Sequence, residues 1–460
     1  MNSLHQTKKH PSAIFFALLA LGMLVSCSDD KQPGADQAPA PAAGSTVQLS
    51  DELYLGKPIV AENVTVWPVY SKKPQEDVGE FLTLAQAQER GVAAVREKGA
   101  TADGAAGQQR QAREQTRNQP NRPQTAQPPA RPQTAQPPAQ PQTAQAQAQA
   151  QLEQQVAPQQ DQTRQQQAVQ VEVGNDAGQQ GQVLVRQGEV DGQVNELVID
   201  NKGEIPIFVL AGTLVKGGKQ DRQIAQDFII PPKQTVPVGA FCVEHGRWTS
   251  QREGKATAGQ FEAQQMLANK SVRGSGQYKQ NQGEVWNKVA QENAVAQKSP
   301  STGTLMATVD ETDKDALARR ERIQKTINSA FDELSKKNPP PLGLAYAVDG
   351  KIREIRSFAH PKILGLYRQT LVNTVAMEAD LAQRQALAKK TPVYSGTADA
   401  QKAVDLVKNA EKLKEDKRDY IGNANAYKQN DAVWNAKTYA KSPEGAAKPA
   451  PMSQSYQPAE

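Results

Sequence analysis

Three short clusters contain the residue types that could carry out chemistry in this chain. Their sequences are GGKQDR at 217–222, CVEHGRW at 242–248 and QGEVW at 282–286. The second cluster places a thiol, a carboxylate and an imidazole close together, and these groups are the components of nucleophilic catalysis or of a metal site. In an extended strand alternate side chains face opposite ways, so Cys242 and Glu244 share one face while His245 lies on the other. We therefore expect Cys242 to be a buried strand residue, with a nucleophilic role as the weaker alternative.

The basic residues of these clusters could bind an anion. Guanidinium groups match carboxylates and phosphates in a bidentate way, so Arg222 and Arg247, together with Lys219, could form an anion-binding patch. The alternative is an internal network of ion pairs with three acidic residues, Asp221, Glu244 and Glu284. The candidate ligand-binding residues are Lys219, Gln220, Arg222, Glu244, Arg247 and Gln282.

The sequence gives little sign of a cofactor or a metal. Gly217 and Gly218 lack the spacing of a phosphate loop or of a dinucleotide-binding loop. Only two histidines follow the N-terminal apolar segment, and one of them, His360, precedes Pro361 and would cap a helix there. We therefore expect no cofactor and no metal site.

Residues 1–26 have the parts of a signal peptide. Lys8 precedes an apolar run at 13–25, and a small residue stands before Cys27. The run is shorter than the ~20 residues of a membrane-spanning helix, so we expect it to be removed. Residues 24–27 (LVSC) resemble a lipobox, whose cysteine receives lipid, and two or more acyl chains anchor a protein stably. We predict a palmitate-bearing lipoprotein with its lipid on Cys27; an ordinary secretory signal with a chance cysteine is the alternative.

The residues near the predicted cleavage site also bear on location and partners. Ser28 follows the cysteine, whereas aspartate there is the inner-membrane retention signal of Gram-negative lipoproteins. This favours the outer membrane, facing the periplasm, over the inner membrane. Cleavage removes Lys8 and Lys9 and no acidic residue, which leaves 52 basic and 49 acidic residues. Such a balance favours no polyanion, so we expect no nucleic-acid partner. Cys242 is the only other cysteine, so no disulfide can form within the mature chain.

The rest of the chain divides into folded and low-complexity segments. Residues 27–50 predict a flexible, lipidated tether. Residues 51–99 predict the first part of a folded domain, and residues 169–440 predict its main part. Between them, residues 100–168 are rich in Gln, Ala and Pro and repeat RPQTAQPPA, which predicts a disordered insertion. The polar residues 441–460 predict a disordered tail.

Hydrophobic periodicity indicates the elements that position the clusters. Alternating or β-rich segments predict strands at 64–70, 92–95, 169–173, 182–186, 196–200, 205–215, 227–232, 235–244 and 433–439, and a hairpin at 344–352 with Asp-Gly at its tip. Helical spacing predicts helices at 81–87 with Thr83 as cap, 261–267, 285–295, 313–336, from 361 and at 400–417. One stripe of the 313–336 helix carries Leu317, Ile323, Ile327, Phe331 and Leu334.

The three clusters resemble a known family when they are taken together. A strand leading to glycine and KQ-x-R, a strand ending in CVE-x-GRW and a Q-x-x-VW helix are similar to the ARG and rhodanese-phosphatase-superfamily-associated protein domain, in which ARG abbreviates ADP-ribosylglycohydrolase. The resemblance covers roughly 51–99 and 169–439, which implies that the repeat-rich segment interrupts one domain. Asp221 departs from the asparagine common in the family. The family name records an association and no reaction, so no catalytic residue is carried over.

These observations predict one α+β domain with a mainly antiparallel sheet and several amphipathic helices. For function they leave two hypotheses. The first is a membrane-tethered cell-envelope lipoprotein with a non-catalytic binding or scaffold domain, whose partners are the membrane and an envelope protein or small molecule. The alternative is an enzyme or ligand-binding domain for a phosphate-bearing or nucleotide-like, ADP-ribose-related molecule. An open pocket lined by the candidate residues would favour the alternative, whereas burial and mutual pairing would favour the first hypothesis.

Overall fold

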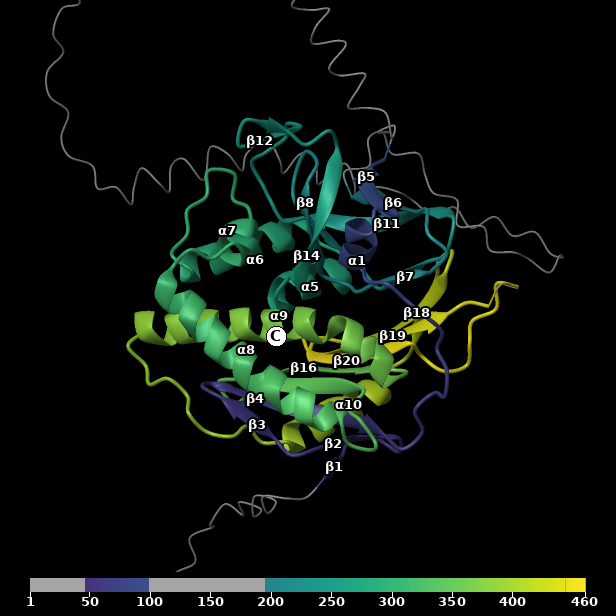
Figure 1. The fold of residues 1–460 in the computed structure, drawn as a ribbon. Coiled ribbons are helices and arrows are strands. Elements are labelled where there is room, and N and C mark those ends of the chain that lie inside the picture. Colours follow the sequence, from purple (N-terminus) through teal and green to yellow (C-terminus); the bar gives the residue numbers. More distant parts are fainter. Residues whose placement is uncertain (1–45, 99–194, 443, 460) are drawn as a thin grey trace, which may run out of the picture. The chain divides into compact units, whose positions relative to one another are not determined.

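The computed structural model describes residues 46–98, 195–442 and 444–459 (Figure 1). The predicted signal peptide, Cys27, the insertion at 100–168 and the predicted strands at 169–173 and 182–186 lie outside the described residues. The described stretches combine helices with many antiparallel strands, so the predicted α+β class is confirmed. No helix within these stretches is long and apolar enough to span a membrane.

A ten-stranded antiparallel sheet forms one layer of the fold. In spatial order its strands are β1 (Val47–Gln48), β2 (Leu53–Leu55), β4 (Val64–Ser71), β15 (Gly343–Val348), β16 (Lys351–Phe358), β20 (Ser453–Pro458), β19 (Val433–Ala440), β18 (Asn423–Gln429) and β17 (Asp416–Asp419), while β3 (Ile59–Ala61) pairs with β4 off this path. Apolar side chains cover both faces of its first half, where β4 and β15 are buried along nearly their whole length.

A closed antiparallel barrel forms the second layer. Its strands, in order around the barrel, are β11 (Gln234–Cys242), β6 (Glu196–Asn201), β5 (Ala93–Glu97), β14 (Gln260–Leu267), β8 (Thr213–Gly217) and β9 (Arg222–Ile224). Apolar residues from these strands, such as Val95, Ile199 and Val238, fill one buried cluster. Two short pairs stand beside the barrel, β7 (Ile207–Val209) with β10 (Phe228–Ile230) and β12 (Gln251–Arg252) with β13 (Lys255–Ala256).

The described stretches on the two sides of the insertion share these layers. From the first stretch, β4 pairs with β15 of the sheet, and β5 pairs with β6 and β14 of the barrel. The short helix α1 (Leu84–Glu89) also belongs to this stretch, and Thr83 caps it as predicted, because its hydroxyl accepts a hydrogen bond from the Gln86 N–H. Residues 46–98 are therefore an integral part of the same fold.

The helix α9 (Pro361–Ala388) packs between the two layers, against β14 of the barrel and β15 and β16 of the sheet (Figure 1). His360 caps it, as predicted, by accepting a hydrogen bond from the Lys362 N–H, and Pro361 occupies the first turn, where a missing N–H costs nothing. The other helices in the described stretches are α5 (Lys270–Gln277), α6 (Gln282–Val295), α7 (Met306–Val309), α8 (Lys314–Ser335) and α10 (Gln401–Glu411).

The predicted hairpin at 344–352 and the predicted helix at 313–336 are confirmed, and one position of the helix differs from the prediction. The hairpin of β15 and β16 turns at Asp349 and Gly350, both with positive φ, as the favoured two-residue hairpin turn requires. The α8 helix buries Ile323, Ile327 and Phe331 of the predicted stripe. Leu317, which was expected on that stripe, is instead 46 % exposed.

The prediction of a helix at 261–267 is wrong, because these residues form the strand β14. The strand pairs with β5 through Phe261 and with β8 through Ala263 and Leu267. Its register shifts between Ala263 and Leu267, which indicates a bulge. The bulge breaks the two-residue alternation, so the apolar positions acquire a spacing that imitates a helix.

The prediction of a disordered tail at 441–460 is also wrong, because β20 lies inside the large sheet between β16 and β19. Its sequence is polar, yet Ser453, Ser455 and Gln457 are buried. Ser453 donates a hydrogen bond to Asp227, and Asn435 donates to the Ser455 carbonyl. A strand that buries hydrogen-bonded polar groups shows no hydrophobic pattern.

Two element boundaries also differ from the predictions. The predicted tether extended to residue 50, but the described fold begins at 46, with β1 paired to β2 and Leu49 buried. The helix expected at 400–417 ends at Glu411, and residues 416–419 form the edge strand β17 instead.

Candidate functional site

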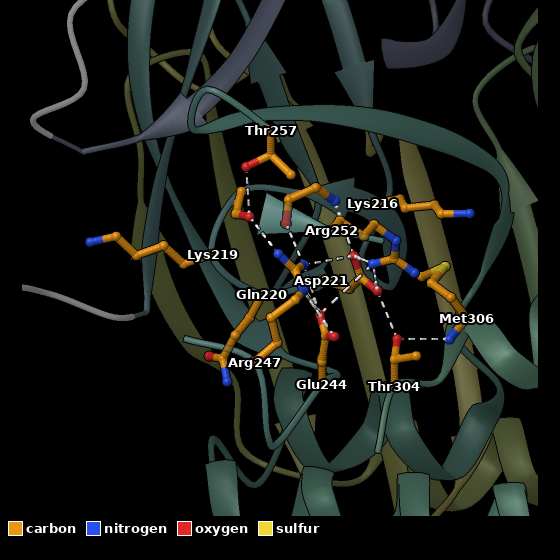
Figure 2. A network of polar contacts seen from close by, with 12 residues as sticks. Lys216, Lys219, Gln220, Asp221, Glu244, Arg247, Arg252, Thr257, Thr304 and Met306 are labelled. Atoms are coloured by element: carbon orange, nitrogen blue, oxygen red, sulfur yellow. Dashed lines mark hydrogen bonds and ion pairs between the residues drawn. The ribbon is translucent and has the colours of Figure 1, made fainter. Parts of the chain in front are cut away.

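The first two sequence clusters meet at one end of the barrel (Figure 2). The turn between β8 and β9 carries Lys219, Gln220 and Asp221, and the segment after β11 carries Glu244 and Arg247. Further members come from segments that the sequence did not single out. They are Arg252 of β12, Thr257 after β13, and Thr304 before α7.

Arg247 and Glu244 form a buried pair at the centre of this network, with 7 % and 1 % of each residue exposed. The guanidinium Nη2 lies 2.8 Å from the Glu244 carboxylate and also donates to the Gly217 carbonyl at 2.9 Å, while Nη1 donates to the Gly218 carbonyl at 2.8 Å. Burial alone would raise the pKa of Glu244, but hydrogen bonds from Arg247, Thr302 and the Asp221 N–H outweigh it and lower this pKa. The carboxylate is therefore held ionised, and the guanidinium is fully engaged.

Asp221 is the second buried acid of the network and is matched in the same way. Arg252 lies 2.6 Å from both of its carboxylate oxygens, the Thr304 hydroxyl donates to it at 2.7 Å, and the Gly217 N–H donates at 3.0 Å. Asp221 stands where the family resemblance led us to expect asparagine. Arg252 supplies the cation that the extra negative charge needs.

Gln220 and Arg222 bond to each other and to the backbone. Arg222 is 3 % exposed and donates to the Gln220 side chain at 3.1 Å, and Gln220 donates to the His245 carbonyl at 3.2 Å. Lys219 differs, because its side chain is 56 % exposed and extends away from the network, with Nζ 3.8 Å from a Glu97 oxygen (Figure 2).

The third cluster holds a helix to the barrel. The Gln282 side chain accepts a hydrogen bond from the Cys242 N–H and donates to the Cys242 carbonyl, each at 2.8 Å, which fixes the start of α6 to the end of β11. Glu284 does not join the buried ion pairs, contrary to the predicted internal network, because it pairs with Lys279 at 2.7 Å.

Cys242 is fully buried, whereas His245 is exposed and packs edge-on against Trp286. Burial raises the pKa of the Cys242 thiol to about 11. The thiol is therefore protonated at neutral pH, which makes it a poor nucleophile.

A polar cavity of about 150 Å³ lies elsewhere, between α5, α6, α9 and β16, and the sequence reading missed it. It is lined by Asn269, Lys270, Ser271, Gln291, Glu292, Val295, Arg353, Glu378, Leu381, Ala382 and Gln385. The Glu292 carboxylate accepts a hydrogen bond from the Ser271 hydroxyl at 3.1 Å, and Glu378 accepts one from the Lys270 N–H at 2.6 Å. Burial raises the pKa of Glu292 to about 7, the nearby Glu378 adds to this, and Ser271 and Arg353 offset it in part.

The sequence carried a signal for these two acids. Glu292 stands seven residues after Val285 in α6 and is half-buried, and Glu378 stands seven residues after Leu371 in α9 and is buried, so each lies close to the apolar face of its helix. A carboxylate on an apolar stripe is uncommon without a partner or a function.

Comparison with known proteins identifies a family. The family model of the ARG and Rhodanese-Phosphatase-superfamily-associated Protein domain, ARPP-1, matches residues 157–445, more than half of the chain. The match does not extend to 51–99, although those residues share both layers of the fold. No curated protein matches the chain, and no solved structure does. The match over residues 157–445 shows that the chain belongs to the ARPP-1 family.

Proposed function

We propose that this protein is a lipid-tethered component of the cell envelope whose ARPP-1 domain is a non-catalytic binding or scaffold domain. The observation that carries the non-catalytic part is the burial and mutual pairing of Asp221, Glu244, Arg247 and Arg252. The sequence around Cys27 supports the tether.

The network has the properties of a structural junction. A buried ion pair needs matched charges and further hydrogen bonds to offset the loss of hydration, and Arg247 and Glu244 have both. A site that binds a phosphate would instead keep guanidinium donors accessible to it. Arg222 and Arg247 are buried and bonded to protein acceptors, so the phosphate-binding alternative has little support from this geometry.

The tether is tested by labelling growing cells with a palmitate analogue and fractionating the membranes. We expect the full chain to carry label, to lose residues 1–26 and to sediment with the outer membrane. The matched control is Cys27→Ala, which should take up no label. Recovery of unlabelled chain that retains its first residues in the cytosol would overturn the tether.

The binding or scaffold role is tested in the same cells by crosslinking at the membrane before fractionation. A neighbour that is captured with the wild-type chain and lost with Cys27→Ala supports a role that depends on tethering. Identical capture by both chains contradicts that dependence.

A further inference from the structure

The polar cavity between α5, α6, α9 and β16 is open to solvent and shares no residue with the buried network. Gln291 of α6 and Gln385 of α9 line it, and both residues are exposed, so a solute can reach it. Val295, Leu381 and Ala382 form an apolar part of its wall. A ligand can therefore place polar groups against the charged side chains and carbon atoms against this wall.

The charged side chains of the cavity balance one another. Its lining residues include two carboxylates and two cations, each from a different element: Glu292 from α6, Glu378 from α9, Lys270 from α5 and Arg353 from β16. When Glu292 is ionised, above its pKa of about 7, these formal charges sum to zero. A ligand with a net charge would leave a charge unmatched in a partly buried place, which is costly, whereas a neutral ligand preserves the balance.

The cavity offers hydrogen-bond acceptors and donors close together. The Ser271 hydroxyl lies 3.1 Å from the Glu292 carboxylate, and Asn269 and Arg353 also lie beside this carboxylate. With about four lone-pair sites each, the carboxylates of Glu292 and Glu378 have more acceptor capacity than these neighbours use. Within the described part of the chain, the buried Nε of Arg353 donates to no acceptor. A neutral group that both donates and accepts can therefore bond to both kinds of partner.

We propose that this cavity binds a vicinal diol, with its two hydroxyl groups between the carboxylates of Glu292 and Glu378 and the guanidinium of Arg353. A hydroxyl donates one hydrogen bond and accepts others, so it can donate to a carboxylate and accept from the guanidinium without adding charge. The carbon atoms of the diol then contact the apolar wall. The inference names a ligand class for the binding role proposed above, on which it rests, and is independent of the lipid tether.

The size of the cavity limits how much of the ligand enters it. Its volume is about 150 Å³. An enclosed apolar cavity of about this volume in another protein accommodates benzene, which has about six heavy atoms, as glycerol does. A sugar ring is larger, so only the edge that carries two neighbouring hydroxyl groups would enter, and the rest would project past Gln291 and Gln385. The vicinal diol can thus come from a small free polyol or from a sugar.

The test is a titration of the full chain with three uncharged probes, glycerol, methyl α-D-glucoside and acetamide. The chain is held at about pH 8 in lauryldimethylamine oxide, a detergent without hydroxyl groups, and saturation-transfer difference NMR measures binding. We expect saturable binding of at least one hydroxylated probe and roughly tenfold weaker binding of acetamide, which has a donor and an acceptor and no hydroxyl. Tighter binding of glycerol would assign the site to free polyols, and tighter binding of the glucoside would assign it to sugars. Binding of acetamide as tight as that of the hydroxylated probes, or no binding of any probe, overturns the proposal.

Matched variants locate the binding. Glu292→Gln keeps the size of the side chain, removes one acceptor oxygen and upsets the charge balance, so it should weaken binding of the preferred diol roughly tenfold, as should Arg353→Gln. Glu284→Gln makes the same change on the same helix at a carboxylate that pairs with Lys279 instead, and it should bind normally. Circular dichroism confirms that each variant is folded, and wild-type affinity in folded Glu292→Gln and Arg353→Gln would contradict the assignment. Failure here would leave the palmitate-labelling result intact, so the two proposals can fail separately.

Discussion

The buried network and the polar cavity contain the same kinds of residue and differ in how the charges are matched. In the network, Glu244 and Asp221 each meet an arginine at hydrogen-bond distance, and the pKa of Glu244 is lowered. In the cavity, Glu292 and Glu378 lie near each other, and the pKa of Glu292 is raised to about 7. The two regions therefore differ at their carboxylates: hydrogen bonds outweigh burial at Glu244, whereas burial outweighs the partners of Glu292.

A separate group of ion pairs around Glu311 and Asp380 resembles the network. Glu311 is paired with Arg384 at 2.7 Å and with Lys298 at 2.7 Å, and Asp380 is paired with Arg319 at 2.7 Å. Burial would raise the pKa of Glu311, but hydrogen bonds from Lys298 and from backbone N–H groups lower it to about 2. These matched charges join α9 to α8 and to the segments that follow α6 and α7.

The largest expected effect comes from breaking a matched pair. Arg247→Ala leaves Glu244 buried and without its main partner, so we expect a loss of roughly 3–5 kcal/mol in unfolding free energy, measured by urea denaturation. Lys336→Ala breaks a pair with Glu333 that is exposed on both sides and should leave the unfolding free energy almost unchanged. A loss of under about 1 kcal/mol for Arg247→Ala would show that the network is not a structural junction.

Substitution of Glu292 in the cavity is expected to increase the unfolding free energy, by an amount between the other two effects. The folded-state pKa of Glu292 is about 7, above its usual 4.5, so the folded protein binds more protons than the unfolded chain between these values. Glu292 therefore lowers stability as pH rises through this window. Glu292→Gln should gain roughly 1–3 kcal/mol at about pH 8 and almost nothing at about pH 4. Urea denaturation at both pH values measures the unfolding free energy. An equal change in this free energy at both pH values would contradict the raised pKa of Glu292.

The smallest effect is expected at the exposed margin of the network. Lys219 extends into solvent and lies 3.8 Å from Glu97, so Lys219→Ala should change the unfolding free energy by less than about 0.5 kcal/mol. The comparison with Arg247→Ala separates the two basic residues that the sequence grouped together. If Lys219→Ala lost nearly as much unfolding free energy as Arg247→Ala, membership of the sequence cluster, and not burial, would determine the effect of a substitution.

Local signals predicted much of the fold. Thr83 before α1, His360 and Pro361 before α9, and Asp349 with Gly350 in the hairpin each determine a backbone conformation within a few residues. Such signals do not depend on distant parts of the chain, so they can be recognised in a single sequence. The polar strand β20 and the bulged strand β14 depend on distant partners, and their patterns misled the prediction.

The sequence indicated only some members of the network and did not indicate its geometry. The clusters contain Asp221, Glu244 and Arg247, but Arg252 comes from β12 and Thr304 from the segment before α7, and only the fold brings them together. The cavity acids Glu292 and Glu378 were overlooked because they belong to none of the three sequence clusters and lie in two different helices, α6 and α9.

The position of the insertion has a consequence for how the polypeptide tolerates cleavage. Glu97 of β5 is opposite Leu197 of β6, so the described chain leaves the barrel and re-enters it at neighbouring points of one ladder. Lengthening a loop whose ends are held together adds little closure entropy. A protease that cut between residues 98 and 195 would leave two fragments that interlock through both layers, and the nicked protein would remain assembled as a non-covalent pair.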